Sequence, residues 1–207
     1  MNLPDYPFVP RRFDRGDGLH MSYLDEGQGD PVVMVHGNPT WSYYYRKLVL
    51  ALRGEYRCIV PDHVGMGLSD KPDDRHYHYT LDTRINDLDR LLASLDIGER
   101  VTLVVHDWGG LIGLNWALRH PGKVRRLVVL NTAGFTMPDG KTLPWQLALG
   151  RHTRLGALLI RGLNAFAGGA VWMAVKKPMP RDVRRAYLSP YNSWANRIST
   201  LRFVQDI

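Results

Sequence analysis

The order of apolar and polar positions over the first 134 residues predicts strands that alternate with helices. PVVMVHG (31–37) is a continuous apolar run, as expected of a strand buried on both faces. Four further segments are also predicted to be strands: MSYLDEG (21–27), YRCIVPD (56–62), VTLVVHD (101–107) and VRRLVVLN (124–131).

Helices are predicted between these strands. Thr40 is placed to cap a helix over 41–53, and Thr80 to open a second helix that Gly98 ends. The apolar positions of the second helix recur every three or four residues, at Leu81, Ile85, Leu88, Leu92 and Leu95. A third helix is predicted over 108–119, immediately after the strand at 101–107, and Pro121 with Gly122 stops it.

This alternation predicts an α/β fold, with a mostly parallel sheet and helices on both of its faces. Ligands of such sheets bind outside the carboxyl ends of the strands, where HGNPTW, PDHVGMGLSD and HDWGG are placed. After Gly134 the alternation stops, and 144–172 has apolar positions at helical spacing. We therefore predict a core domain over 1–134 and a helical lid over 135–207. A helical continuation packed elsewhere on the sheet is the alternative.

The segment TLVVHDWGGLIG (102–113) has the form of a nucleophile elbow, a sharp strand-to-helix turn, with Asp107 in the place of a serine. An aspartate with an ordinary pKa of about 3.9 is ionised at pH 7, so its attack needs no proton transfer. The product is an ester or an anhydride, which requires a substrate with a good leaving group or a strained ring. Alkyl halides, epoxides and lactones qualify. A carboxylate that only caps a helix is the alternative.

Two residues beside this turn carry N–H groups that can stabilise a leaving group or an oxyanion. One usual donor is the backbone N–H after the nucleophile, and a loop after an earlier strand supplies the other. Trp108 and Asn38 occupy these positions. Their side chains add an indole N–H and a carboxamide. Plain packing for Trp108 and a turn role for Asn38 are the structural alternatives.

Longer motifs resemble the haloalkane dehalogenase family of α/β-hydrolases, namely HGNPTWSYYYRKL, PDHVGMGLSDKP and VVHDWGGLIGLNWALRHP. In that family an Asp is the nucleophile and an Asn and Trp pair holds the departing halide, so the resemblance implies these roles for Asp107, Asn38 and Trp108. Four segments resemble more narrowly a branch that decarboxylates cis-β-lactones to alkenes in bacterial olefin biosynthesis: FVPRRFDRGDGLHMSYLDEG, VLNTAGF, PWQLALGRH and YNSWANRISTLRFVQDI. The resemblance covers essentially the whole chain and implies an α/β-hydrolase fold.

The chain departs from the family's pattern at the catalytic triad, in which an acid and then a histidine follow the nucleophile. Asn131 occupies the position of one such acid, and only His120 and His152 come after Asp107; we expect neither to be the base. Three histidines of the motif turns are expected to be hydrogen-bonded scaffolding: His36, His63 and His106. We therefore expect these residues to be the N-terminal portion of a longer enzyme with an incomplete lid. Without a base to activate water, hydrolytic turnover of an Asp107 ester should fail.

Three functions remain open. The first is a cis-β-lactone decarboxylase whose apolar, aromatic-rich lid accommodates two alkyl tails. The second is a hydrolytic haloalkane dehalogenase. The third is a truncated, non-catalytic chain that is at most a binding partner. Alkene and CO2 from a lactone, against alcohol and halide from a haloalkane, separate the first two. A thermal melt addresses the third, because a parallel sheet that is cut short exposes an apolar edge.

Composition narrows the setting of this chemistry. The chain is 44% hydrophobic and 23% charged, typical of a globular protein, and it has neither a secretory signal nor an apolar run of membrane-spanning length. With the single Cys58, this predicts a cytoplasmic protein. The sequence shows no metal-ligand spacing, phosphate loop or dinucleotide fingerprint, so we expect neither a metal nor another cofactor.

The formal charge of +7 is concentrated at the C-terminal end of the chain. Residues 151–207 contain ten Lys and Arg against two Asp. This excess predicts either a solvated helical surface or contact with an acidic protein partner, a multi-enzyme complex, an anionic membrane surface or an anionic substrate carrier. Nucleic acid is not expected, since no binding motif accompanies the charge.

Overall fold

The computed structural model describes residues 3–135, 140 and 142–207. Within these residues one sheet has the strand order β1-β2-β4-β3-β5-β6. The strands are β1 Arg11–Asp14, β2 His20–Glu26, β3 Pro31–Val35, β4 Arg57–Pro61, β5 Val101–His106 and β6 Val124–Leu130. The pairs β1–β2 and β2–β4 are antiparallel, and β4, β3, β5 and β6 are parallel. The predicted, mostly parallel α/β-hydrolase sheet is confirmed.

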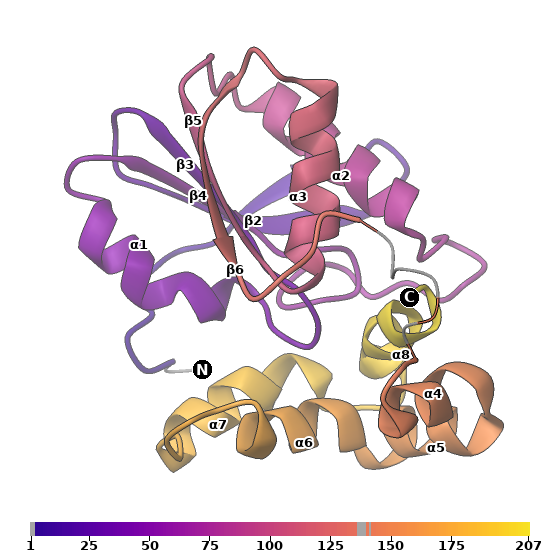
Figure 1. Cartoon of the computed structure of the whole chain (residues 1–207). Coiled ribbons are helices and arrows are strands. Elements are labelled where there is room, and N and C mark those ends of the chain that lie inside the picture. The colour runs from indigo at the N-terminus through magenta and orange to yellow at the C-terminus, as the bar shows by residue number, and fades with distance from the viewer. Residues whose placement is uncertain (1–2, 136–139, 141) are drawn as a thin grey trace.

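Helices cover both faces of the sheet and extend beyond its strand ends (Figure 1). Those in the sheet part are α1 Arg46–Leu52, α2 Leu81–Ser94 and α3 Trp108–Arg119. Beyond the strand ends follow α4 Trp145–His152, α5 Arg154–Leu163, α6 Ala165–Met173, α7 Arg181–Leu188 and α8 Ile198–Gln205. Three short 3-10 helices are η1 Ser42–Tyr45, η2 Ser189–Tyr191 and η3 Ala195–Arg197. Helices α4 to α7 lie below the sheet in this view. That they act as a lid stays a prediction.

Burial on both sides of β3 explains its uninterrupted apolar sequence. Val33 and Val35 point into the core cluster that contains residues of α2 and α3, whereas Val32 and Met34 point into the cluster that contains Val49 of α1. Alternate side chains of a strand point to opposite faces, so a strand between two helical layers must be apolar throughout. β3 thereby lies at the centre of the fold.

Two helix predictions need correction. The segment after β3 begins as the 3-10 helix η1, and the hydroxyl of Thr40 donates to the Gly37 carbonyl instead of capping a helix. The reason is the fully buried Asp62 in the loop after β4, whose Oδ1 accepts the N–H of Ser42 at 2.6 Å. This N–H group of the first turn therefore needs no capping side chain from Thr40. Thr80 does cap α2, as predicted, but that helix ends at Ser94, four residues before Gly98.

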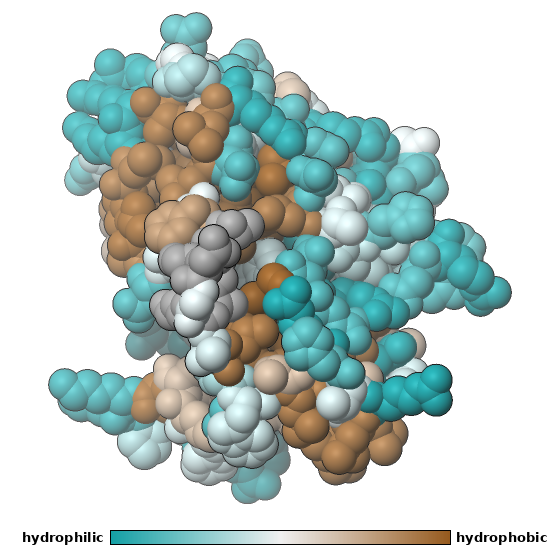
Figure 2. Space-filling model, turned by 45° about the vertical axis from the view of Figure 1, so that its right-hand side comes forward, coloured by the Kyte–Doolittle hydropathy of each residue, from teal (hydrophilic) through white to brown (hydrophobic). Residues whose placement is uncertain are grey.

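Exposed apolar side chains gather in two places. Figure 2 shows them over the sheet part above and over the helices beyond the strand ends below. In the sheet they belong to the edge strand β6, at Leu127, Val128, Val129 and Leu130; in the helices beyond they include Trp145, Leu163 and Trp172. No single helix among the described residues is long and apolar enough to cross a membrane. Helices α5 and α6 meet that criterion only together, and they are bent by 72°.

Candidate active site

Strand β5 places Asp107 at a sharp turn before α3. The backbone of Asp107 has φ 53° and ψ −130°, a conformation that few non-glycine residues adopt and that accumulates at functional sites. The turn also needs a close approach of α3 to β3. A Cβ on Gly109 would lie 2.0 Å from the carbonyl oxygen of Val35, so only glycine fits there. The geometry is that of a nucleophile elbow with a carboxylate at its tip.

Backbone N–H groups hold the carboxylate of Asp107. The N–H of Asn38 donates to Oδ1 at 2.7 Å, and the N–H of Trp108 also donates to this carboxylate. Gly37 makes room for it, because a Cβ there would lie 2.1 Å from Oδ1. Burial raises the pKa of Asp107 above its ordinary value, and the two N–H groups oppose that rise. The carboxylate is thus oriented and poorly hydrated, which favours nucleophilic attack.

Asp107 lines a cavity of 570 Å³ between the sheet and the helices beyond its strand ends. On the sheet side the cavity is lined by Asn38, Pro39, Thr40, Tyr44, His106, Asp107 and Asn131. On the other side it is lined by Phe166, Ala167, Ala170, Val171, Ala174, Val175, Met179, Tyr187 and Leu188. Polar groups therefore gather beside Asp107 and apolar groups line the rest, as in a site for an apolar substrate.

The carboxamide of Asn38 is oriented by a residue distant in sequence. Its Nδ2 donates to the carbonyl oxygen of Thr200 in α8 at 3.0 Å, and Asn38 is 8% exposed. This bond uses one of the two hydrogens on Nδ2, so the other can serve a leaving group. The structure thus brings Asp107 and Asn38 together in one cavity, as the sequence predicts.

Trp108 contributes to the site in a different way. Its backbone N–H belongs to the Asp107 turn, but the residue is not among those that line the cavity. Its indole lies in the core cluster, 5.2 Å between ring centroids from Phe203, with the guanidinium of Arg84 6.0 Å from its own centroid. The backbone N–H of Trp108 and the carboxylate of Asp107 are therefore brought together. The donor role of the indole stays a prediction.

The histidines after β3 and β4 form a buried pair. The Nε2 of His36 accepts the N–H of His63 at 3.3 Å, and Nε2 of His63 lies 2.9 Å from the carbonyl oxygen of His36. Burial lowers the pKa of His36 to about 4 and that of His63 well below its ordinary value. Both rings are neutral at pH 7 and hold the two loops together, which is the predicted scaffolding role.

His106 differs from that pair, and sequence reasoning missed its position in the cavity. Its ring stacks on Tyr44 at 4.6 Å, with 18° between the ring planes. Its Nδ1 is buried and has no hydrogen-bond partner among the described residues. Burial lowers the pKa of His106, while the charge of Asp107 opposes that shift. The sequence contains no signal for this stacking, because Tyr44 is one of three consecutive tyrosines.

The two histidines that follow Asp107 lie outside the cavity. His120 follows the last residue of α3, at the end of that helix away from the elbow, and its Nε2 lies 2.6 Å from Oδ1 of Asp89. His152 is an exposed residue of α4. Asn131 does line the cavity, at the predicted position of a triad acid. Among the residues that the structure describes, no three His, Cys, Asp or Glu side chains are grouped as metal ligands would be.

Comparisons with known proteins agree with this geometry. Residues 30–152 match the family model described as the alpha/beta hydrolase fold. A cis-3-alkyl-4-alkyloxetan-2-one decarboxylase of Xanthomonas campestris is 58% identical over 214 aligned residues, which cover 100% of this chain and 71% of the relative. The enzyme of the same name from Shewanella oneidensis is 59% identical, and the match covers 95% of this chain and 62% of that relative.

More distant relatives are haloalkane dehalogenases. The one from Mycolicibacterium smegmatis is 34% identical, over 97% of this chain and 66% of its own length. The crystal structure of a mutant of haloalkane dehalogenase DatA from Agrobacterium tumefaciens matches with a TM-score of 0.85 at 29% identity, over 95% of this chain and 67% of that chain. The chain spans 71% and 62% of the lengths of the two decarboxylases. It belongs to the α/β-hydrolase fold family, in the group that contains the haloalkane dehalogenases and the cis-3-alkyl-4-alkyloxetan-2-one decarboxylases.

Proposed function

We propose that the protein decarboxylates cis-3-alkyl-4-alkyloxetan-2-ones, which are cis-β-lactones, to alkenes and CO2, with Asp107 as the nucleophile. The observation that carries the proposal is the carboxylate of Asp107, held by the N–H of Asn38 at 2.7 Å at the edge of a largely apolar cavity. Two relatives at 58% and 59% identity are named for this reaction. A strained four-membered ring suits an already ionised nucleophile.

The chemistry that Asp107 supports needs neither water nor a proton donor. Its free carboxylate oxygen attacks C4 of the lactone, the bond from C4 to the ring oxygen breaks, and a carboxylate remains on C3. The bond from C3 to that carboxylate then breaks, its electron pair forms the C3–C4 double bond, and Asp107 leaves C4 as CO2 departs. Inversion at C4 followed by anti elimination keeps the two alkyl groups on one side of the double bond, and Asp107 is regenerated.

The donors beside Asp107 act on the oxygen that departs in the first step. The ring oxygen gains negative charge as its bond to C4 breaks, and the Nδ2 of Asn38 is positioned to donate to it, because Thr200 fixes the carboxamide. We propose that the Trp108 indole, the other predicted donor, contributes less to this step, because Trp108 is not among the residues that line the cavity. No step requires a histidine that activates water, so His106 needs only to pack beside the nucleophile.

The test is product analysis in water enriched in heavy oxygen. With a long-chain cis-β-lactone we expect an alkene and CO2, and no heavy oxygen in the peptide that contains Asp107 after many turnovers. Hydrolysis of an Asp107 ester by water would label that carboxylate. If no alkene forms, the proposed function is wrong; if alkene forms together with a labelled Asp107, the water-free route is wrong.

Haloalkane dehalogenation is the second candidate, and the carboxamide of Asn38 at the cavity favours it. The same carboxylate would displace a halide, and the ester would then need an activated water. The described residues place no histidine other than His106 along the cavity beside Asp107. We therefore expect a 1-haloalkane to give at most one equivalent of halide per chain, with Asp107 left esterified.

The basic helices suggest a further partner. Five exposed residues have no acidic partner in the described part of the chain: Arg154, Lys176, Lys177, Arg181 and Arg185. We propose that this surface contacts an acidic protein or a neighbouring enzyme of a complex. We also propose a cytoplasmic location, because the one cysteine, Cys58, is free and buried.

A further inference from the structure

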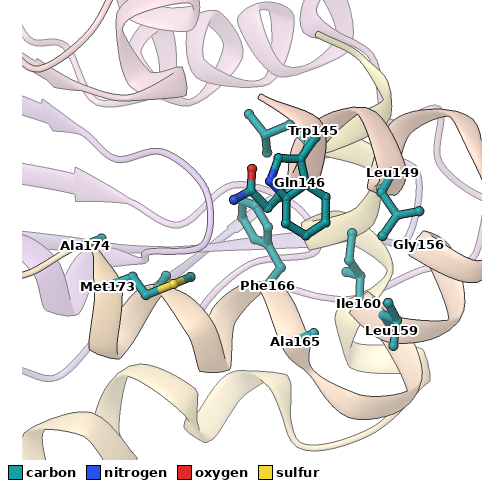
Figure 3. A pocket seen from close by; sticks show the side chains of 13 residues that line it. Trp145, Gln146, Leu149, Gly156, Leu159, Ile160, Ala165, Phe166, Met173 and Ala174 are labelled. Atoms are coloured by element: carbon teal, nitrogen blue, oxygen red, sulfur yellow. The ribbon is translucent and has the colours of Figure 1, made fainter. Parts of the chain in front are cut away.

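A second cavity lies among the helices beyond the strand ends. It has a volume of 470 Å³ and lies between α4, α5 and α6 (Figure 3). The described residues that line it carry no charged side chain, and Gln146 is the one with a polar amide. We call it the lid cavity, and the space beside the nucleophile the Asp107 cavity. An apolar chamber of this size is suited to hydrocarbon.

The two cavities adjoin along helix α6. Phe166, Ala170 and Ala174 line both of them. These residues are four positions apart and so form one stripe along the helix. Ala167 and Val171, on one side of the stripe, line only the Asp107 cavity, whereas Ala165 and Met173, on the other side, line only the lid cavity.

The shared stripe is a thin partition. Ala170 and Ala174 present a methyl group each, so the only large side chain in the stripe is that of Phe166. In Figure 3 the ring of Phe166 stands away from α6 toward Trp145 and Gln146. Phe166 is only partly buried, so rotation about its side-chain bonds can open a connection between the two cavities.

We propose that the lid cavity receives one of the two alkyl tails of the substrate, which passes Phe166, while the lactone ring and the other tail stay in the Asp107 cavity. The inference rests on the proposed function. The two tails of a cis-3,4-dialkyl lactone leave adjacent ring carbons on the same face, and two adjoining apolar cavities can hold one tail each when the ring lies at Asp107. Each methylene that moves from water into the lid cavity raises the affinity for the lactone about fourfold.

The test uses three lactones: two long tails, a methyl at C3 with a long tail at C4, and the reverse. Ala170→Phe fills the partition, and Leu159→Trp fills a part of the lid cavity that does not border the Asp107 cavity. We expect both variants to lower kcat/KM for the dialkyl lactone and for one methyl isomer by about 10- to 100-fold, the loss of a few buried methylenes. The other methyl isomer should be processed by Leu159→Trp as by the unmodified protein, because Leu159 does not line the Asp107 cavity.

Leu163→Trp is the matched control, because Leu163 lies one turn after Leu159 in α5, is 75% exposed and lines neither cavity. Equal losses for all three lactones in Leu159→Trp, with a melting curve like that of the unmodified protein, would mean that the lid cavity is a common entrance. No loss would mean that the cavity holds no tail. Either result overturns the proposal.

Binding of the corresponding dialkylcyclobutanones, in which a methylene replaces the ring oxygen, separates this inference from the proposed function. These analogues cannot decarboxylate, so their calorimetric affinity reports on the cavities alone. Tail-specific loss of affinity in Leu159→Trp would support the two compartments even if no alkene forms from any lactone. Alkene formation with affinity independent of the variants would leave the reaction in place and remove the second compartment.

Discussion

The turn at Asp107 and the helices α4 to α6 are built on opposite principles. At the turn, backbone groups set every position: Gly37 and Gly109 leave no room for a Cβ, and the N–H of Asn38 holds the carboxylate. In α4 to α6 side chains form the cavity wall, from the small Ala170 to the large Phe166, and other large side chains such as Trp172 are exposed. Under the proposed function, the core would fix the chemistry, and the helices beyond it would set which substrates enter.

The boundary between these two regions does not coincide with the start of the helical segment. Helix α8 is tied to the core, because Thr200 accepts from Asn38 and Asp206 pairs with the buried Arg84 at 3.1 Å. Tyr191, which ends η2, donates to the carbonyl of Thr40 at 3.1 Å. Part of the predicted lid therefore supports the active site, while α4 to α6 form the adaptable wall. The division at residue 134 stays a prediction.

The largest expected effect comes from the nucleophile itself. Asp107→Asn removes the ionised oxygen and keeps the shape of the side chain, so we expect alkene formation to fall by about 10⁴-fold or more. Thermal unfolding should change little or shift upward, since a buried carboxylate is replaced by a neutral amide. Product analysis with a melting curve of the same preparation checks both parts. Activity within tenfold of the unmodified protein would remove Asp107 from the mechanism.

The next effect distinguishes the two predicted donors. Asn38→Ala should lower kcat/KM by about 10²- to 10³-fold, the usual loss for one donor of an oxyanion hole. Trp108→Phe keeps the backbone N–H and the packing on Phe203, so we expect a smaller loss, about tenfold or less, as the indole does not line the cavity. Steady-state kinetics of the two variants, measured side by side, compare the two losses of kcat/KM. Equal losses would show that the indole N–H donates to the reacting oxygen, as the sequence predicts.

A third variant tests the backbone principle directly. Gly37→Ala places a methyl group 2.1 Å from Oδ1 of Asp107, so the carboxylate or its loop must move. A displacement of this kind lowers activity by about 100-fold. Gly54→Ala is the control, because a Cβ at Gly54 meets nothing within 4 Å. If Gly37→Ala retained full activity, the orientation of the carboxylate by this loop would be unimportant.

Sequence patterns predict those positions that are determined by the path of the backbone. The buried run at 31–37 and the HDWGG turn identify two strands, and β3 pairs in parallel with β5, Val35 opposite Val105. Residues just after both strands, Asn38 and Asp107, must then meet. This is why the proximity of Asp107 and Asn38 could be predicted from the sequence, whereas their catalytic roles stay predictions.

Patterns fail where a side chain depends on a distant segment. Nothing near Asn38 indicates that Thr200 will orient its amide from 162 positions away. The direction of the Trp108 indole depends on Phe203 in α8, and the η1 turn depends on Asp62. The shared wall of the two cavities was also beyond prediction, because it depends on how α6 lies over the sheet.

The pH dependence of stability should separate the buried core from the exposed helices. The folded-state pKa of His36 is lowered from 6.5 to about 4. The contribution of neutral His36 to the free energy of unfolding is therefore fully present above pH 6.5 and is lost as the pH falls to about 4. That shift corresponds to roughly 3 kcal/mol. The pKa of Asp62 is raised to about 6, which opposes this loss, because its protonation between about pH 6 and 3.8 favours the folded state.

Urea unfolding between pH 8 and pH 4 measures the net slope. We expect stability to fall toward acid, since His63, whose pKa is also lowered by burial, adds to the effect of His36. His36→Asn should flatten the slope while lowering stability at pH 8. His152→Gln, at an exposed site in α4, should reproduce the slope of the unmodified protein. An unchanged slope in His36→Asn would contradict the origin proposed for it.

The smallest effect on stability and catalysis is expected at the basic surface of the helices. Lys177→Glu combined with Arg185→Glu changes exposed side chains without ion-pair partners in the described residues, so stability should change by no more than about 0.5 kcal/mol. Retention on immobilised polyglutamate should fall clearly, and added salt should remove the difference because it screens exposed charges. Turnover of a lactone should be unchanged, since neither residue lines the Asp107 cavity. Equal retention of both proteins at low salt would mean that the excess charge only keeps this surface hydrated. A lower turnover would mean that charge on the basic surface affects the reaction at Asp107.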